Sequence, residues 1–535
     1  MKKLPVGKQN IRDILSNNLL YVDKTRQIYE LIQQGSLYFL SRPRRFGKSL
    51  TISVLKEIFS GNRALFQGLH IAEKADYDWQ SYPILHFSFN DFGHQATELE
   101  RLFNEAISKY AKAFDVEVDA VNLIGQFKNL VESVAEKTGK SVVILIDEYD
   151  KPIVDFLTEH EQAKKNQKVL REFFSPLKGL ESRGLLRFLF ITGVSKFSKV
   201  SLFSDLNNLT DLTISPLAKD LVGITHEELL ENFSDRIQAA GESLKMSKEF
   251  LLEGVQLWYN GYSFDGTVSL YNPFSLLSFF QQYRFRNFWF ATGTPTFLVE
   301  MARHKRLEPQ ELEHKKVAES FFNTYSLEHL DLIGLLYQTG YLTIKDTSPN
   351  RYDVDYILGY PNQEVRKSFV HNLLEAYTFQ TDSTVSSALL NMKDGLRTGD
   401  LDLFFKNLNI LFADLSYFHH PKAREKAEAE AKLFAMWEGY FHSIIYLVTV
   451  FLGLEVQSEI AKHQGRLDLV AETEDYLYLM EFKLEQPIEN AIQQIKERDY
   501  AASYQNTAKN LILVGVNFSK ATRSIEAWES EVWER

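Results

Sequence analysis

Asp468, Glu481 and Lys483 are the side chains in this sequence whose types and spacing best suit metal-dependent chemistry. They lie in residues 465–483, two runs of alternating and β-branched apolar residues with an expected turn at 474–475. With that turn, the numbers of opposed residues add up to 949, so Asp468 faces Glu481, and Lys483 projects from the same face. Carboxylates that close repel each other unless a cation lies between them or one is protonated. We therefore predict a divalent metal with oxygen ligands; the alternative is an exposed polar hairpin with a chance salt bridge.

A second group of residues could bind phosphate. Residues 37–40 form an apolar, strand-like run, and residues 50–59 have apolar positions at helical spacing. Gly47, Lys48 and Ser49 lie between these two segments, where the helix is expected to begin. In such a loop the backbone N–H groups bind the anion, the lysine reaches the β- and γ-phosphates, and the serine hydroxyl ligates magnesium. The pattern predicts a phosphate-binding loop with Mg²⁺ as its companion ion; a chance occurrence of Gly-Lys-Ser is the alternative.

The loop departs from the usual pattern at Arg42, because the consensus has a glycine six residues before the lysine. A run at 142–146 supports the nucleotide interpretation. It is continuously apolar and ends in Asp147 and Glu148, as expected for a central parallel strand that brings acids to its carboxyl end. We expect Asp147 to hold the magnesium ion and Glu148 to polarise the attacking water. The alternative is a buried strand that merely ends in an acidic loop.

A neighbouring strand is expected at 186–191, and it ends near Thr192 and Ser195. Either hydroxyl could sense the γ-phosphate, and capping of the strand end is the alternative for each. Three arginines remain open candidates for an arginine finger: Arg171, Arg183 and Arg187.

Length and composition limit the classes of protein. A chain of 535 residues with 44% hydrophobic and 24% charged residues is expected to form several globular domains. The absence of cysteine excludes disulfides, thiolate zinc sites and cysteine nucleophiles. We see no signal peptide and no apolar run long enough for a membrane span, so the cytoplasm is the expected location. The net charge of −11 argues against strong non-specific binding of nucleic acid, although residues 1–50 contain ten basic and three acidic residues.

Two segments follow the expected ATP-binding region. Residues 221–300 are rich in helix signals, and we interpret them as a helical lid. In residues 301–420 a helix is expected at 327–338 with Ser326 as its N-cap, followed by a strand hairpin, which is similar to a winged helix. A wing that grips phosphates should be basic, whereas this hairpin is acidic, so a structural arm is favoured over DNA binding.

The expected order of elements around the hairpin is helix, three strands, helix, strand. The first helix is predicted at 422–451 and contains Glu438 on an apolar face, where a carboxylate needs a partner. An ordinary glutamate at the boundary of an amphipathic helix is the alternative. A strand at 454–460 precedes the hairpin. A helix at 488–504 and a buried strand at 511–516 follow it.

Residues 1 to about 300 resemble the bacterial AAA-ATPase-like family, a branch of the P-loop ATPases. The resemblance rests on the segments 21–25, 42–49, 146–152, 191–198, 203–209, 258–262 and 271–275. It implies a P-loop α/β fold that binds ATP and Mg²⁺. It also implies that Arg44, Arg45 and Gly47 belong to the nucleotide-binding loop.

Residues 420–535 resemble the PD-(D/E)XK nuclease superfamily through their order of elements, the acid on the second strand and the Glu-x-Lys on the third. The resemblance implies that Asp468 and Glu481 ligate Mg²⁺ or Mn²⁺, that Lys483 orients the water, and that Glu438 is an additional acid. It gives Gln494 and Tyr500 supporting roles. Leu467 stands where the superfamily has a proline.

Together these expectations describe an α/β multidomain chain with a P-loop domain (1–220), a helical lid (221–300), a winged-helix-like middle (301–420) and a restriction-endonuclease-like domain (421–535). The function expected is an ATP-controlled, metal-dependent nuclease. Its expected partners are nucleotide and nucleic acid, with DNA favoured, and no membrane; a homo-oligomer stays open. One alternative is a nucleotide-gated regulatory or scaffold protein that binds nucleic acid without cutting it. The other is a nuclease that acts on RNA.

Overall fold

The structure is a computed structural model. It describes residues 1–74, 76–90, 98–196, 203, 206, 208–292, 296–305, 307–323, 330–349, 353–412, 441, 443–453, 469–498, 500–504, 507–519, 522 and 524–533. Within these ranges, no helix combines the length and the apolar character needed to cross a membrane.

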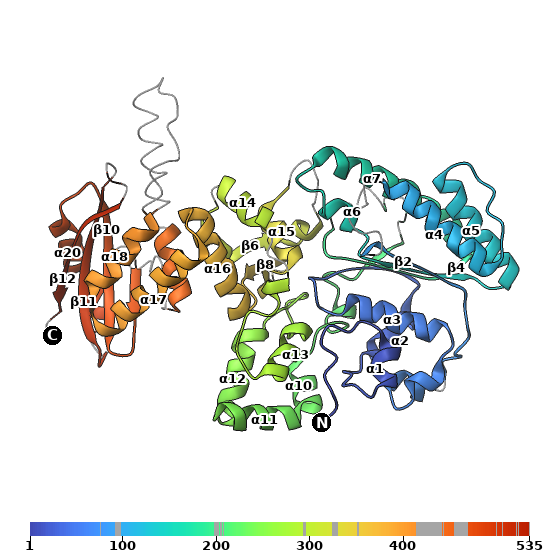
Figure 1. The fold of residues 1–535 in the computed structure, drawn as a ribbon, viewed down its shortest axis with the longest axis horizontal. Helices are drawn as coiled ribbons and strands as arrows, with labels where there is room; N and C mark the ends of the chain where they lie inside the picture. The colour runs from blue at the N-terminus through green and yellow to red at the C-terminus, as the bar shows by residue number, and fades with distance from the viewer. Residues whose placement is uncertain are drawn as a thin grey trace, which may run out of the picture. The chain divides into compact units, whose positions relative to one another are not determined.

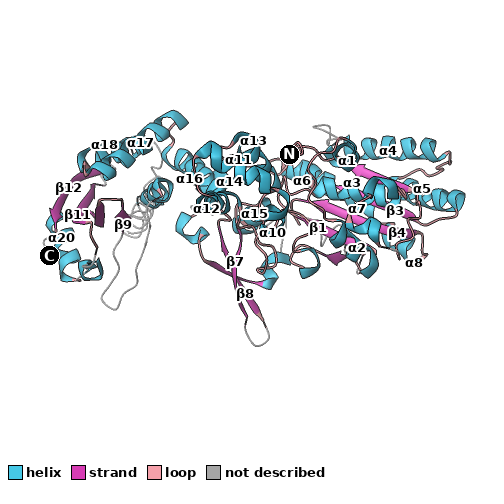
Figure 2. Cartoon of the chain, turned by 90° about the horizontal axis from the view of Figure 1, so that it is seen from below, coloured by secondary structure: helices cyan, strands magenta, loops and turns pink. Residues whose placement is uncertain are grey.

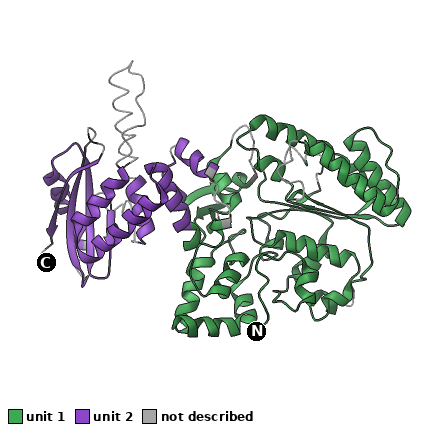
Figure 3. Cartoon of the chain, viewed as in Figure 1, with its two compact units in different colours: residues 1–294, 314–365 green, residues 295–313, 366–535 purple. Residues whose placement is uncertain are grey.

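The chain divides into two compact units, which Figure 3 shows in different colours. The first contains residues 1–294 and 314–365, and the second contains residues 295–313 and 366–535. The expected P-loop segment and residues 221–294 of the expected lid therefore belong to one unit, and the expected middle segment, 301–420, is shared between the two.

The first unit is built around a five-stranded sheet in which all neighbouring strands are parallel. Its strands, in order across the sheet, are β2 (Ile84–Ser88), β3 (Val142–Asp147), β4 (Leu186–Gly193), β1 (Leu37–Ser41) and β5 (Thr210–Asp211). All residues of β1 and β3 are buried, because a parallel sheet has helices on both faces. The sequence-based strands at 37–40, 142–146 and 186–191 are thereby confirmed.

Helices cover both faces of this sheet: α1, α2 and α3 lie on one side, and α4, α5 and α7 lie on the other (Figure 1). Aromatic rings fill the space beneath the second group, where Phe173 contacts Phe87, Phe103 and Phe127 with centroid separations of 3.9–5.1 Å. The helices are α1 (Ile11–Ser16), α2 (Thr25–Gln34), α3 (Lys48–Phe59), α4 (Leu99–Phe114), α5 (Leu123–Thr138), α6 (Lys151–Val154), α7 (His160–Phe174) and α8 (Leu177–Ser182).

A helical segment follows in the region expected to be a lid. It contains α10 (His226–Asn232), α11 (Ser234–Leu244), α12 (Lys248–Tyr259) and α13 (Pro273–Gln282). The Thr225 side chain and Glu228 form a reciprocal capping box at the start of α10. These helices share one apolar core with partly buried residues near the N-terminus, including Leu4, Leu20 and Val22.

The remaining part of the first unit is a helix beside a small antiparallel sheet. Its elements are α15 (Leu332–Thr339), β6 (Lys315–Ala318), β7 (Thr343–Pro349) and β8 (Val354–Gly359), with β8 between β6 and β7. Figure 2 shows β7 and β8 side by side. The helix was expected to begin near 327, but the Asp331 side chain caps it by accepting from the N–H of Gly334. The expected cap, Ser326, lies outside the described residues.

The second unit begins with helices. They are α14 (Thr296–His304), α16 (Gln363–Thr378), whose first three residues belong to the first unit, α17 (Asp382–Thr398) and α18 (Leu401–Phe412). Residues 443–452 are also helical and almost fully buried, as expected for the apolar run found there.

A four-stranded sheet completes the second unit. Its strands, in order across the sheet, are β12 (Ser524–Val532), β11 (Asn510–Ser519), β10 (Tyr476–Leu484) and β9 (Leu469–Glu472). Between β10 and the parallel β11 the chain forms α20 (Ile488–Glu497) and a 3-10 helix, Tyr500–Tyr504. The helix expected through 504 is therefore interrupted, and β12 is an addition that the sequence did not predict. The expected first strand, 454–460, lies outside the described residues.

Candidate nucleotide and nuclease sites

The phosphate-loop candidate connects β1 to α3. Gly47 has a φ of 99° and directly precedes Lys48, the first residue of α3. This left-handed conformation favours glycine. Arg45 has a φ of 66°, so the loop also contains a non-glycine residue in the less favourable left-handed region. The strand, loop and helix expected from the sequence are thus present, with the helix N-terminus at Lys48 and Ser49.

Arg42 anchors the start of this loop. Its guanidinium donates to the carbonyl oxygens of Ser41, Leu212, Thr213 and Ala218 at 2.6–3.3 Å. It also lies 4.0 Å above the centre of the Phe264 ring. Burial lowers the pKa of Arg42 to about 10, which leaves it charged at neutral pH. A buried arginine with four carbonyl partners therefore holds the position where the consensus has glycine.

Lys48 is buried, and its ammonium group donates to the carbonyl oxygens of Arg42 and Pro43 at 2.9 and 3.0 Å. Burial lowers the pKa of Lys48, while the acids Glu148, Asp147 and Asp150 oppose that shift. The lysine side chain thus bonds to the backbone at the start of the loop that precedes it. Its position at the N-terminus of α3 also allows it to reach an anion bound there.

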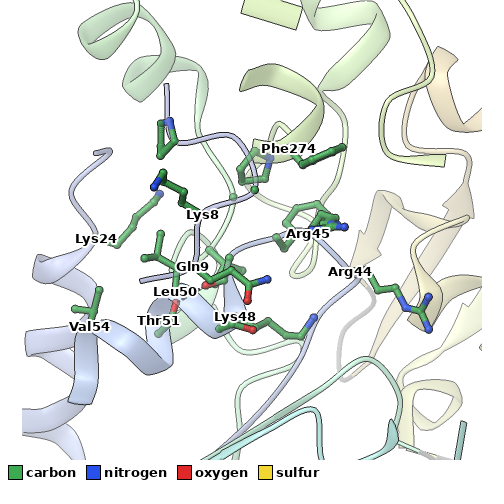
Figure 4. Close-up of a pocket in the computed structure, with 18 of the residues that line it drawn as sticks. Lys8, Gln9, Lys24, Arg44, Arg45, Lys48, Leu50, Thr51, Val54 and Phe274 are labelled. Carbon is green, nitrogen blue, oxygen red and sulfur yellow. Dashed lines mark hydrogen bonds between the residues drawn. The ribbon is translucent and has the colours of Figure 1, made fainter. Parts of the chain in front are cut away.

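A cavity of about 440 Å³ opens beside the loop. Lys8 and Lys24 lie on one side of it, and Arg44, Arg45 and Lys48 come from the loop (Figure 4). Apolar side chains complete the wall; they include Leu20, Val22, Val54, Leu221, Ile224, Phe274 and Leu277. A wall with one cationic part and one apolar part suits a ligand that has both phosphates and a flat base.

Of the two expected acids, Glu148 lines this cavity, and Asp147 is the last residue of β3. Asp147 is 4% exposed, and the hydroxyl of Thr192 donates to its carboxylate at 2.6 Å. Glu148 lines the cavity and has a φ of 55°, so the chain turns sharply after the strand. Thr192 is fully buried and contacts the carboxylate expected to hold magnesium, which is the role of a positioning residue.

The second candidate site lies in the C-terminal sheet. β9 and β10 pair with the register expected from the sequence, for example Leu479 with Val470 and Met480 with Leu469. Glu481 on β10 is 2% exposed. The ammonium of Lys483 donates to the Glu481 carboxylate at 2.9 Å and to the side-chain oxygen of Gln494 at 2.6 Å. The amide nitrogen of Gln494 also donates to Glu481, so these three expected residues meet.

Of the metal ligands expected at this site, Glu481 is the one that the structure describes, and it presents a carboxylate almost entirely shielded from water, a ligand type that hard divalent cations prefer. Asp468 and Glu438, the other two expected ligands, lie outside the described residues. Tyr500 belongs to the apolar core around Val470 and Leu479, and its hydroxyl accepts from Arg498 at 3.1 Å.

Comparison with known proteins assigns a family to each of the two regions. Residues 5–203 match the family described as predicted AAA-ATPase (AAA-ATPase-like), and residues 436–528 match the PD-(D/E)XK nuclease superfamily. A protein of Azotobacter chroococcum mcd 1, described as an uncharacterized protein in the vnfD 5' region, is 36% identical over 532 residues, which is 98% of each chain.

The chain belongs to the AAA-ATPase-like family with a C-terminal PD-(D/E)XK nuclease superfamily domain.

In this AAA-ATPase-like chain the segment 21–25 contacts the start of α10 through Lys24. The Asp23 carboxylate accepts from the N–H groups of Thr25 and His70 at 2.8 Å. Lys24 forms a nearly buried ion pair with Glu228 of the capping box, with a nitrogen-to-oxygen distance of 2.6 Å. Tyr21, Val22 and Lys24 of this segment line the cavity beside the loop.

Sequence reasoning missed Asp150, although it stands three residues after Asp147. Its carboxylate is buried and accepts from the N–H of Val194 and from both the N–H and the hydroxyl of Ser195. Burial raises the pKa of Asp150. Ser195 is therefore occupied in holding the end of β4, which favours the capping interpretation for that residue.

Two of the three arginine-finger candidates contact side chains of their own unit. Arg183 forms an ion pair with Glu132, and Arg187 lies about 5.5 Å from the ring of Tyr82 and 5.6 Å from that of Phe59. Neither lines the nucleotide cavity.

Trp289 supports the phosphate loop from a distant part of the sequence. Its indole N–H donates to the carbonyl oxygen of Arg44 at 3.0 Å, and its backbone N–H donates to Glu364 at 2.6 Å. Gly340 approaches the loop so closely that an added Cβ would lie 2.7 Å from Pro43. The two contacts with the loop span more than two hundred residues, so no local pattern in the sequence predicts them.

Gly515 explains how α20 reaches the nuclease site. It pairs with Glu481 across β10 and β11, and an added Cβ would lie 3.0–3.1 Å from Ile492, Ala491 and the carbonyl oxygen of Ile488. The missing side chain lets α20 pack close to the sheet, with Gln494 next to Glu481. A glycine inside a buried strand is the signal that could have revealed this approach.

Proposed function

We propose that this chain binds and hydrolyses ATP at residues 42–49 and hydrolyses phosphodiester bonds in nucleic acid, preferentially DNA, at the C-terminal sheet. The observation that supports the nuclease most directly is the contact of Glu481, Lys483 and Gln494. A buried carboxylate, a lysine and an amide at bonding distance are the groups that the superfamily resemblance assigns to this chemistry.

In the proposed nuclease site, Glu481 holds Mg²⁺ or Mn²⁺ together with Asp468 and Glu438. The metal, when bound, supplies positive charge that lowers the pKa of water and stabilises the leaving oxygen. Lys483 positions the attacking water and offsets the negative charge that develops on the phosphate. Gln494 orients Lys483 and Glu481 through its two hydrogen bonds, and Tyr500 supports α20 from the core.

In the proposed ATP site, Lys48 leaves its carbonyl partners and contacts the β- and γ-phosphates, while Arg44 and Arg45 add positive charge at the cavity wall. Gly47 permits the turn that exposes the backbone N–H groups. Ser49 and Asp147 hold Mg²⁺, Thr192 orients Asp147, and Glu148 polarises the attacking water.

The nuclease assignment is tested with the full chain on plasmid DNA, single-stranded DNA and RNA in the presence of Mg²⁺ or Mn²⁺. Glu481→Gln and Lys483→Ala should each lower cleavage by about 100-fold or more, because each removes a charge from the reacting centre. Lys496→Ala is the matched control, since Lys496 is an exposed α20 residue paired with Glu531. Cleavage that survives both active-site substitutions contradicts the assignment. Binding of DNA without cleavage by the wild type would favour the regulatory alternative.

The ATP assignment is tested by nucleotide binding and by release of phosphate. Lys48→Ala should abolish binding, and Glu148→Ala should bind ATP but not turn it over. Lys56→Ala, an exposed substitution on the same helix, should behave as the wild type. A wild-type chain that binds no nucleotide would remove this part of the proposal.

A further inference from the structure

A cluster of metal-type ligands lies in the second unit, on elements that neither proposed activity uses. Among the described residues, His371, Glu375 and Asp382 bring one ligand atom each to within 4.8 Å of one another. His371 and Glu375 lie four residues apart on α16, so they share one face of that helix. Asp382 is the first residue of α17.

The atoms converge on one ring nitrogen. Nε2 of His371 lies 2.7 Å from a carboxylate oxygen of Asp382 and 3.4 Å from one of Glu375. Burial raises the pKa of Glu375, His371 lowers it, and the neighbouring Asp382 raises it again. Two carboxylates this close repel each other, and a cation between them removes the repulsion.

The imidazole ring of His371 is mostly buried and packs against an aromatic ring. Its side chain is 16% exposed, and its ring lies 5.4 Å from the ring of Phe451. Nδ1 is buried and has no hydrogen-bond partner among the described residues. A neutral imidazole carries one N–H, so Nε2 either donates its proton to the Asp382 carboxylate or, with the proton on Nδ1, offers a lone pair to a metal ion. Nε2 is thus the nitrogen that faces both carboxylates and could join them as a ligand of one ion.

We infer that His371, Glu375 and Asp382 form a binding site for one divalent transition-metal ion that holds α16 against α17. One imidazole nitrogen and two carboxylate oxygens suit Zn²⁺, Mn²⁺ or Fe²⁺ better than Mg²⁺, which prefers oxygen ligands alone. Asp382 has a side chain that is 77% exposed, so water can complete the coordination. Ligand atoms bound to zinc lie about 2.0–2.2 Å from the ion, so small side-chain rotations bring these three to one centre.

The site would stabilise the helical layer that supports the nuclease sheet. The Tyr478 hydroxyl on β10 donates to the carbonyl oxygen of Leu396 on α17 at 2.8 Å. Gly399, which ends α17, lies so close to Tyr476 that an added Cβ would be 2.9 Å from its ring. An ion that fixes α17 to α16 therefore acts on a helix already bonded to the strand that contains Glu481.

The test measures metal binding rather than cleavage. The full chain with Glu481→Gln, which removes a proposed ligand of the nuclease metal, is stripped with a chelator and titrated with Zn²⁺ and with Mn²⁺ in the absence of nucleotide. We expect tight binding of one ion per chain, together with a higher melting temperature. Adding Asp382→Asn should weaken this binding at least about 10-fold, a loss typical even of residues that only support a metal ligand.

Asp382 was chosen because its exposure makes the substitution compatible with folding, which circular dichroism checks. His371→Ala should lose the same ion, and His304→Ala, an exposed histidine at the end of α14, should keep it. Equal metal stoichiometry and affinity with and without Asp382→Asn would overturn the inference and leave a hydrogen-bonded ion cluster only. Because Glu481 is already replaced, this outcome is independent of whether the chain is a nuclease.

Discussion

Arg42 shows how one residue can replace a conserved backbone feature by a network of hydrogen bonds. A glycine at this position makes a tight turn possible through its conformational freedom. Arg42 instead fixes the turn from outside, through carbonyl oxygens of residues 41 and 212–218. The conformation of the loop therefore depends on the packing between β1, β5 and the segment that follows β5.

We predict that Arg42→Ala lowers the free energy of unfolding of the first unit by about 3 kcal/mol or more. It leaves several buried carbonyl oxygens without donors, and each such loss costs about 1–3 kcal/mol. The free energy of unfolding of Arg42→Lys should lie between those of the wild type and Arg42→Ala, because an ammonium group cannot reproduce the planar fork of a guanidinium. Thermal unfolding and ATP affinity are the measurements, and both should decrease. Arg26→Ala, which breaks an exposed pair with Glu30, is the control; a similar loss in that variant would contradict the prediction.

Glu364 is predicted to make the first unit less stable as the pH rises. Burial raises the pKa of Glu364 to about 7, against 4.5 for the free side chain, although the backbone N–H of Trp289 donates a hydrogen bond that opposes the shift. Between those values the folded protein keeps a proton that the unfolded chain releases, so the free energy of unfolding falls by up to about 3 kcal/mol. Below pH 4.5 both states are protonated and the effect is absent.

Glu364→Gln stays neutral and should remove this pH dependence. Urea unfolding of both proteins at pH 5 and pH 8 measures it: the wild type should lose roughly 2–3 kcal/mol more than the variant over that range. Glu30→Gln, at an exposed position, should follow the wild type. Parallel losses in the wild type and Glu364→Gln would show that this carboxyl does not titrate as described.

At the scale of elements, the nuclease site depends on how closely α20 packs against β11. The three residues that meet there come from a strand and from a helix outside the hairpin. Gly515 sets their separation, because a larger side chain at that point of β11 would touch the backbone and side chains of α20.

Gly515→Ala is accordingly predicted to reduce cleavage more than stability. The added methyl group must push α20 outward by a few tenths of an ångström, which costs about 1–3 kcal/mol and loosens the contact of Gln494 with Glu481. Gly179→Ala on α8 is the matched control, since a Cβ there meets no atom within 4 Å. The measurements are the cleavage rates and melting temperatures of both variants. A Gly515→Ala variant that cleaves as fast as the wild type would contradict the proposed role of α20.

At the scale of the whole molecule, the chain combines two units with separate cores and a proposed site in each. The proposal that ATP controls the nuclease makes a prediction for the full chain. ATP should change the rate of DNA cleavage by the wild type, and Lys48→Ala should cleave at one rate with or without ATP. Lys56→Ala should respond as the wild type. Identical wild-type rates in both conditions would mean that the two sites work independently.

The sequence by itself determined the features that depend on short separations along the chain. The pairing of β9 with β10 follows from the turn at 474–475 and the two-residue period of a strand. The acids after β3 and the lysine at the start of α3 follow from the order of apolar run, loop and helix. Such patterns also indicated where Glu481 and Lys483 would point, because residues two apart share a face.

Only the tertiary structure decided which distant residues complete each site. The carbonyl partners of Arg42, the support of the loop by Trp289 and Glu364, and the meeting of His371 with Asp382 all depend on how helices and strands pack. The five cations Lys8, Lys24, Arg44, Arg45 and Lys48 lie in one basic segment of the sequence, yet the fold is what gathers them around a single cavity. Periodicity specifies which face a residue occupies; packing alone specifies what that face meets.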